Sequence, residues 1–300
     1  AALNALPAPL RKEAEAELAF AFPERAGEAR AFERPVPVGG WSVTVGRNGA
    51  LTSVRNDALG IDRRVNLGAF CYESFGGKEA EDCFFDYVRD SKTNFAWAAC
   101  DFGKPGLRYE TSIKHGLWDA CADELRQTGD KLTVFLHGEE EAAGTYGCPR
   151  ELALTYRFLP DSIELSLYWR GKDALRSPEA LWLGFDLCAN NPNRWTMQKL
   201  GKSVSPLNVV SGGNRRLHAV ERLFCQTALE ELEIVPKDAP LVSVGGRYLY
   251  DTADEAGDMQ NGFWFLLCNN RWGTNFPQWF EDDMRFSFTV SLKELAPAVR

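Results

Sequence analysis

The segment over residues 268–279 combines side chains that could bind a polar, ring-shaped ligand, and it reads CNNRWGTNFPQW. It places Arg271 and Asn275 among Trp272 and Trp279. Amides form paired hydrogen bonds with hydroxyls, and aromatic rings offer flat apolar faces, which together are what a sugar site requires. The alternative is a buried loop whose backbone groups are capped by Asn side chains. The composition of this segment is consistent with both interpretations.

A second segment, NRRLHAV over residues 214–220, contains one of only three histidines in the chain. If it forms a strand, Arg216 and His218 face one way and Leu217 and Ala219 the other, because successive strand residues point to opposite faces. Histidine titrates near neutral pH, so His218 is the best candidate acid for two-sided chemistry on a sugar ring. The sequence identifies no base to pair with it.

Other kinds of chemistry find little support in the sequence. His115, His137 and His218 stand in none of the usual zinc-binding spacings, so we expect no metal site in this chain. No nucleophile elbow, phosphate-binding loop or dinucleotide fingerprint occurs. The chain has 42 acidic residues, and a glycosidase needs two of them facing one bond, but spacing alone does not reveal which converge. The catalytic residues therefore stay unknown at this stage.

Charge and cysteine usage exclude several partners. A formal net charge of −8 and a pI near 5.1 argue against nucleic acid and against an anionic membrane surface. No apolar run approaches the length of a membrane-spanning helix. The eight cysteines include no Cys-x-x-Cys pair. We expect Cys71, Cys188 and Cys268 to be free and buried, which suits a reducing, cytoplasmic compartment.

The elements that would position these residues are mostly strands. Apolar and polar residues alternate over residues 132–136, 152–158, 163–169 and 284–293, and we expect roughly a dozen strands in total. Residues 10–22 predict one short helix, ended by Pro23, and residues 23–40 read as a linker rich in Pro, Gly and Arg. Over residues 62–130 we expect long loops, short strands and a short helix. The sequence thus predicts a helix and linker over residues 1–40, followed by a mainly β domain over residues 41–300 built from two stacked antiparallel sheets.

Three stretches carry a resemblance to a known family: WAACDFGKPGL at 97–107, a run broken by a Gly/Pro turn and expected to be strand-like; residues 195–220; and NNRWGTNFPQWFEDDMRFSF at 269–288. They resemble the C-terminal β-region of bacterial proteins related to glycoside hydrolase family 38 α-mannosidases, in an uncharacterised family, over about residues 40–293. The resemblance implies a large antiparallel β-supersandwich of the galactose mutarotase type. It also implies a parent protein with an N-terminal zinc-binding α/β barrel that carries out catalysis. No residue here matches the zinc ligands or the Asp nucleophile of that barrel.

The resulting hypothesis is a non-catalytic, carbohydrate-associated domain of a glycoside hydrolase, which buttresses or completes a sugar site. Its partners would be its own N-terminal catalytic domain and carbohydrate, with no cofactor in this chain and zinc only in that catalytic domain. One alternative is a free-standing sugar mutarotase or epimerase with His218 in an open cleft. The other is a purely structural interaction module without a pocket. The candidate substrate-binding residues, expected on one rim, are Arg216, His218, Arg271, Trp272, Asn275 and Trp279.

Overall fold

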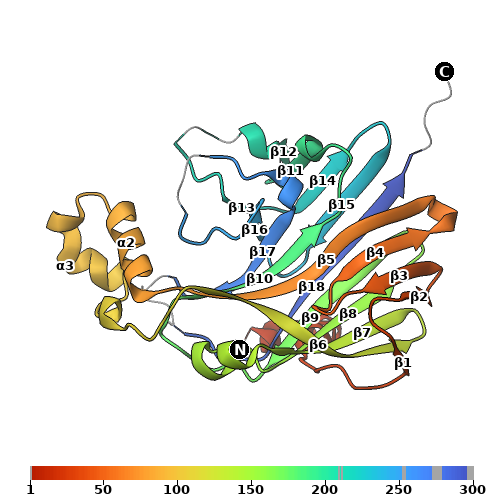
Figure 1. The fold of residues 1–300 in the computed structure, drawn as a ribbon, viewed down its shortest axis with the longest axis horizontal. Helices are drawn as coiled ribbons and strands as arrows, with labels where there is room; N and C mark the ends of the chain where they lie inside the picture. Colours follow the sequence, from red (N-terminus) through yellow and green to blue (C-terminus); the bar gives the residue numbers. More distant parts are fainter. Residues whose placement is uncertain (1, 209, 211, 252–254, 272–278, 296–300) are drawn as a thin grey trace.

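Two antiparallel β-sheets, which we call sheet A and sheet B, make up most of the molecule (Figure 1). The structure is a computed structural model that describes residues 2–208, 210, 212–251, 255–271 and 279–295. Sheet A has the strand order β12 (Lys202–Val204), β11 (Trp195–Lys199), β14 (Arg222–Gln226), β15 (Glu230–Pro236), β18 (Met284–Glu294), β9 (Ser162–Arg170), β8 (Glu151–Phe158), β7 (Lys131–Gly138), β6 (Gly116–Thr128) and β1 (Glu28–Arg30).

Sheet B is the smaller sheet, and one long strand connects it to sheet A. Its strand order is β2 (Pro35–Val38), β3 (Trp41–Val45), β4 (Leu51–Asn56), β5 (Ile61–Ser74), β10 (Glu179–Asp186), β17 (Phe263–Asn269), β16 (Leu241–Val244) and β13 (Leu217–Ala219). β6 pairs with the end of β5 over Gly116 to Asp119 and then with β7 from Ala120 onward. This crossover joins the two sheets at one edge.

The main core lies between the two sheets. In β18, Phe286, Phe288 and Val290 are buried while the residues between them are partly exposed, as the alternation over residues 284–293 predicted. The ring of Phe288 in sheet A lies 4.9 Å from that of Phe185 and 5.1 Å from that of Phe265, both in sheet B. Side chains from two inner faces therefore interdigitate. The prediction of a mainly β fold with two stacked antiparallel sheets is confirmed.

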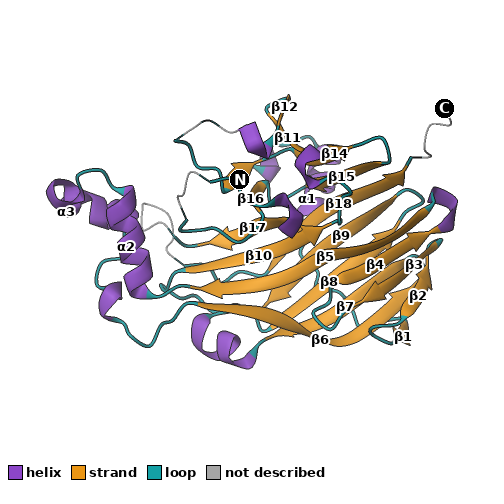
Figure 2. Ribbon diagram, turned by 45° about the horizontal axis from the view of Figure 1, so that its top comes forward, coloured by secondary structure: helices purple, strands orange, loops and turns teal. Residues whose placement is uncertain are grey.

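The helical content exceeds the expectation. α1 (Ala8–Leu18) matches the predicted N-terminal helix but ends before Pro23. α2 (Gly77–Tyr87) and α3 (Ser91–Phe102) project from one end of the sandwich (Figures 1 and 2). The strand expected at residues 97–102 is thus wrong, because the run AWAAC is rich in Ala, a strong helix former, and a short apolar run does not distinguish a helix from a strand by period.

Short helical turns connect the strands. They are η1 (Leu3–Ala5), η2 (Asp57–Leu59), η3 (Leu107–Tyr109), the π-type turn η4 (Ala142–Tyr146), η5 (Pro192–Arg194), η6 (Pro206–Asn208) and η7 (Met259–Asn261). Of these, η3 bears on function, because it follows α3 and packs back against α2.

The segment expected to be a linker contains strands. β1 and β2 both lie within residues 23–40, and β2 forms a hairpin with β3 that buries Val36 and Val38. Its prolines are tolerated because β2 is an edge strand and an edge leaves one row of N–H groups unpaired. These residues therefore belong to the sandwich itself, while the division of the chain at residue 40 stays a prediction.

The cysteines differ in how deeply they are buried. All eight cysteines are free thiols. Cys71 is buried as expected, but Cys268 is only partly buried and Cys188 is exposed. Cys188 follows the end of β10 with a left-handed backbone (φ 48°), so it has already left the sheet. No helix among the described residues is long and apolar enough to cross a membrane.

Candidate functional site

The face of sheet B that points away from the main core carries its own set of side chains. Along β5, Phe70 and Tyr72 belong to the main core, whereas Cys71 belongs to a second, smaller apolar cluster. Glu73 shares the side of Cys71, because alternate strand residues point to the same face. We call this the outer face of sheet B. Its apolar cluster is completed by Trp182 and Ala180 on β10, Leu266 on β17, and Leu249 and Phe75.

A buried carboxylate stands at the edge of this cluster. Glu73 is 4% exposed; its Oε2 accepts a hydrogen bond from Nε1 of Trp182 at 2.7 Å. Its Oε1 lies 3.2 Å from Nε2 of His115, whose Nδ1 lies 3.0 Å from Oε1 of Glu79 on α2. Burial raises the pKa of Glu73, although the Trp182 hydrogen bond and the nearby charges of His115 and Arg247 lower it. We call Glu73, His115, Glu79, Trp182 and Arg247 the Glu73 cluster.

Arg247 provides hydrogen-bond donors on the outer face of sheet B, and its charge acts on the Glu73 carboxylate. Its guanidinium lies 4.3 Å over the ring of Trp264, a partly buried residue on β17. Within the part of the chain that the structure describes, this guanidinium makes no ion pair or hydrogen bond to a side chain or carbonyl. A guanidinium carries five N–H donors, so Arg247 offers donors next to a flat aromatic face.

The predicted residue Arg271 lies close to this cluster. It is 8% exposed; its Nη1 donates to the carbonyl of Leu249 at 2.6 Å, and its guanidinium lies 5.1 Å over the ring of Tyr250. The ring of Tyr250 meets that of Phe75 edge-on at 4.7 Å, and Phe75 lies 5.3 Å from the ring of His115. Arg271 therefore fixes residues 249–250, which pack against the apolar cluster on the outer face of sheet B.

Arg216 contacts the residues on either side of this pair, Tyr248 and Asp251. Its guanidinium lies 4.2 Å over the ring of Tyr248, and its Nε lies 3.3 Å from Oδ2 of Asp251. Arg216 and Arg271 are more than fifty positions apart in sequence, and both contact one short stretch, residues 248–251. Both are largely occupied by protein groups, so their primary contacts are structural.

His218 is placed differently from the expectation. It is 3% exposed on β13, with Nε2 3.1 Å from the carbonyl of Arg215 and Nδ1 3.4 Å from Nζ of Lys199. The contact with a carbonyl assigns the ring proton to Nε2. Burial and the Lys199 charge lower the pKa of His218. The alternation of Arg216 and His218 against Leu217 and Ala219 is confirmed, but the expectation of His218 as an acid in an open cleft is contradicted.

The remaining candidate residues do not test whether all six lie on one rim, so that expectation stays a prediction. Trp272 and Asn275 lie outside the described residues. Trp279, which precedes β18, is 52% exposed. Among the residues with described positions, no three His, Cys, Asp or Glu side chains converge to hold a metal ion.

The residues that sequence reasoning missed are those of the Glu73 cluster. The alternation in the FCYES run at 70–74 could have placed Glu73 opposite the main core, but its partners are Trp182 on β10 and His115, which lies just before β6. No spacing signal links Glu73 to His115 or Trp182, because their contact depends on sheet pairing. Chemically, the cluster offers N–H donors, carboxylate acceptors and aromatic faces within one region.

The geometry distinguishes binding from two-sided proton transfer. A pair that acts on both sides of a sugar ring must be separated by about one ring, on the order of 5 Å. Glu73 and His115 are in direct contact at 3.2 Å, so no ring fits between them. These two side chains are therefore not placed to flank a sugar ring as acid and base.

The chain is similar to known proteins both in sequence and in structure. The profile of a family described as "Domain of unknown function (DUF5054)" matches residues 1–165. No curated protein matches the chain. Similar solved structures include an alpha-mannosidase from Enterococcus faecalis V583, with 10% identity, a TM-score of 0.49, and coverage of 87% of this chain and 29% of that one.

Two further structures illustrate the range of these similarities. One is a protein in glycosyl hydrolase family 38 from Enterococcus faecalis, with 11% identity, a TM-score of 0.48, and coverage of 90% of this chain and 32% of that one. The other is a galactose mutarotase related enzyme from Lactobacillus acidophilus, with 10% identity, a TM-score of 0.43, and coverage of 89% and 99%. The chain spans less than a third of the length of the two Enterococcus proteins.

Proposed function

The chain belongs to the DUF5054 family, and because that family assigns no activity, we propose from the geometry that it is a carbohydrate-binding domain without catalysis of its own. In this proposal the domain is part of a larger glycoside hydrolase related to α-mannosidases. It contacts both its own N-terminal catalytic domain and the sugar, and zinc belongs to the catalytic domain. The proposal draws on the sequence resemblance described above and on the Glu73 cluster.

The observation that carries the proposal is the position of Arg247. Its guanidinium stacks on Trp264, makes no polar contact among the described residues, and lies near the Glu73 carboxylate. A sugar hydroxyl both donates and accepts, so a site for it needs donors and acceptors side by side. Arg247 supplies donors, His115 and Glu79 supply a partly exposed polar edge, and the half-buried rings of Trp264 supply apolar faces.

Two features of the cluster support binding without catalysis by this chain alone. Glu73 and His115 are in direct contact, so this pair does not provide the acid and base across a ring-sized gap that a mutarotase needs. The other candidate acid, His218, is buried against a carbonyl. The remaining groups position hydroxyls and do not provide a matched pair for proton transfer.

The decisive experiment is isothermal titration calorimetry of the chain against mannose, mannobiose and a panel of monosaccharides, with and without zinc. We expect saturable heat that weakens at least about tenfold, or roughly 1.4 kcal/mol, in Arg247→Ala. Arg222→Ala is the matched control, because Arg222 also stacks on an aromatic ring, at 5.6 Å from Phe224, but lies in sheet A. Equal binding by Arg247→Ala and wild type, or no heat with any sugar at millimolar concentration, would overturn the proposal.

A second readout separates binding from catalysis. Exchange between the α and β anomers of each bound sugar is followed by NMR in the presence and absence of the chain. We expect the spontaneous rate in both cases. An accelerated rate that is lost in Glu73→Gln would instead establish a mutarotase. The same titrations with Trp272→Ala and Asn275→Ala test whether the predicted loop joins the site.

A further inference from the structure

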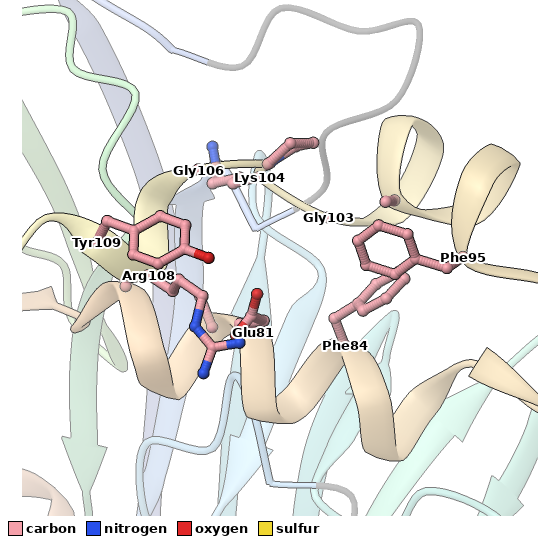
Figure 3. A pocket seen from close by; sticks show the side chains of 12 residues that line it. Glu81, Phe84, Phe95, Gly103, Lys104, Gly106, Arg108 and Tyr109 are labelled. Carbon is pink, nitrogen blue, oxygen red and sulfur yellow. Dashed lines mark ion pairs between the residues drawn. The ribbon is translucent and has the colours of Figure 1, made fainter. Parts of the chain in front are cut away.

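A second candidate site lies in the helical lobe, which we define as residues 76–109. A cavity of about 150 Å³ opens between α2, α3 and the segment that leads into η3 (Figure 3). None of its lining residues belongs to the Glu73 cluster, and the sugar proposal does not use it. Its walls come from Ala80 and Phe84 on α2 and from Phe95 and Ala99 on α3.

The apolar walls present two perpendicular rings. The rings of Phe84 and Phe95 are 6.1 Å apart at an interplanar angle of 85°. Phe84 is 6% exposed, whereas Phe95 is 47% exposed although it is also stacked on Phe85. Aromatic rings prefer edge-to-face or offset stacked neighbours, so a third flat ring would find both kinds of contact here. An apolar cavity of this size accepts a single benzene ring.

The opposite wall of the cavity is charged. Nη1 of Arg108 lies 2.7 Å from Oε2 of Glu81, and Figure 3 shows Glu81 between Arg108 and Phe84. Among residues with described positions, Glu81 is the one ion-pair partner of Arg108, whose guanidinium has further N–H donors. Arg108 is 43% exposed at its side chain, so a ligand can reach it.

A second cation lines the same cavity. Burial, and to a smaller extent the charge of Arg176, lowers the pKa of Lys104 to about 8. Its amine is therefore still mostly protonated at neutral pH. Two cations against the single anion of Glu81 give this cavity a positive balance in a chain whose net charge is −8. An anionic group bound here would be attracted and would raise the pKa of Lys104 again.

The lobe is built to hold this cavity open. Gly77 packs directly against the carbonyl of Leu107, where a Cβ would overlap with the oxygen. Nη2 of Arg176, in the loop before β10, donates to the carbonyl of Pro105 at 3.0 Å. The segment 103–109 is thus fixed both to α2 and to the sandwich, so the distance between the aromatic wall and Arg108 is set by the fold.

From these contacts we propose that the lobe cavity binds a small aromatic carboxylate. The ring lies against Phe84 and Phe95, and the carboxylate is bound by Arg108 with Lys104 nearby. The guanidinium fork matches a planar carboxylate, and the ring fills the apolar volume. This site is independent of the sugar-binding proposal, because neither its residues nor its ligand are shared.

The test uses the whole chain and 4-fluorobenzoate, followed by ¹⁹F NMR titration. Two comparison ligands separate the contributions: 4-fluorobenzyl alcohol keeps the ring without the charge, and acetate keeps the charge without the ring. We expect saturable binding of 4-fluorobenzoate, at least about tenfold tighter than that of either comparison ligand, as one good charge-assisted contact provides.

Three variants connect this binding to the cavity. Arg108→Gln should reduce the affinity for 4-fluorobenzoate to that for the alcohol. Phe95→Ala should weaken both aromatic ligands, and Ala80→Leu should block both by filling the cavity while keeping a good helix former. Trp97→Ala is the matched control, because Trp97 is an exposed aromatic on the same helix that does not line the cavity. Circular dichroism checks that each variant is folded.

The outcomes that overturn the proposal are specific. They are the absence of saturable 4-fluorobenzoate binding at millimolar concentration, equal affinities for the acid and the alcohol, or unchanged binding in both Ala80→Leu and Phe95→Ala. Loss of binding in Trp97→Ala would also overturn it by moving the site out of the cavity. Sugar titrations on the same samples report separately on the Glu73 cluster.

Discussion

Glu73→Gln should stabilise the folded chain at neutral to mildly alkaline pH, although it removes a hydrogen-bonded carboxylate. Glu73 is 4% exposed, and burial raises its pKa despite favourable contacts with Trp182, His115 and Arg247. A raised pKa means that these contacts do not fully offset the cost of burying the charge. Gln keeps the shape and an oxygen that can accept from Trp182. A carboxylate kept at a net cost to stability is typical of a functional site.

The sign of the pH dependence follows from linkage. Because the folded-state pKa of Glu73 lies above its unfolded value, the folded state binds more protons in that window, and stability falls as pH rises through it. The cost is therefore absent at low pH, where Glu73 is neutral in both states. It is fully present once the pH lies above the folded-state pKa of Glu73. Single substitutions that remove an unfavourable buried charge change stability by about 0.5–3 kcal/mol, so we expect a gain on the order of 1 kcal/mol.

The assay is urea unfolding of wild type and Glu73→Gln at about pH 8 and at about pH 4.5, which is close to the ordinary pKa of an unfolded glutamate. The gain should be present at the higher pH and shrink at the lower. Glu151→Gln is the control of opposite sign, because the hydrogen bond from Arg170 lowers the pKa of Glu151, so this substitution should not stabilise. A loss of stability in Glu73→Gln at the higher pH, or a pH-independent effect, would refute the reasoning.

Three further substitutions test the fold that positions both sites. Lys172→Met removes the ion-pair partner that lies 2.7 Å from the buried Glu179 carboxylate, and this should lower the free energy of unfolding in urea by about 3–5 kcal/mol. The double variant Lys172→Met/Glu179→Met should recover most of that stability. In Gly77→Ala the new Cβ overlaps with the Leu107 carbonyl, so the thermal midpoint should fall and amide hydrogen exchange over η3 should become faster. Unchanged exchange would contradict this packing. Phe288→Ala should cost about 3–5 kcal/mol, since the ring is fully buried between the sheets, and a cost below about 1 kcal/mol would contradict its central place in the core.

Local patterning was sufficient for most strands. Residues 284–293 alternate strictly, and they form β18 with the predicted inward face. The strands expected over residues 152–158 and 163–169 are present as β8 and β9, which pair antiparallel. Patterning failed at α3, where Ala-rich sequence reads equally as a short buried strand, and at residues 23–40, where prolines concealed an edge strand. These errors arise where composition and period point in different directions.

The candidate sites show the limit of sequence more clearly. By itself, the sequence determined that the chain is an acidic, mainly antiparallel β protein, because charge and two-residue alternation are local properties. It pointed to His218 through its neighbours in sequence, and the fold buried that side chain. Only the tertiary structure joined Glu73 to His115 and Trp182, and Phe84 to Phe95 and Arg108. Strand pairing and helix docking bring distant residues together, and no local pattern encodes which distant residues will meet.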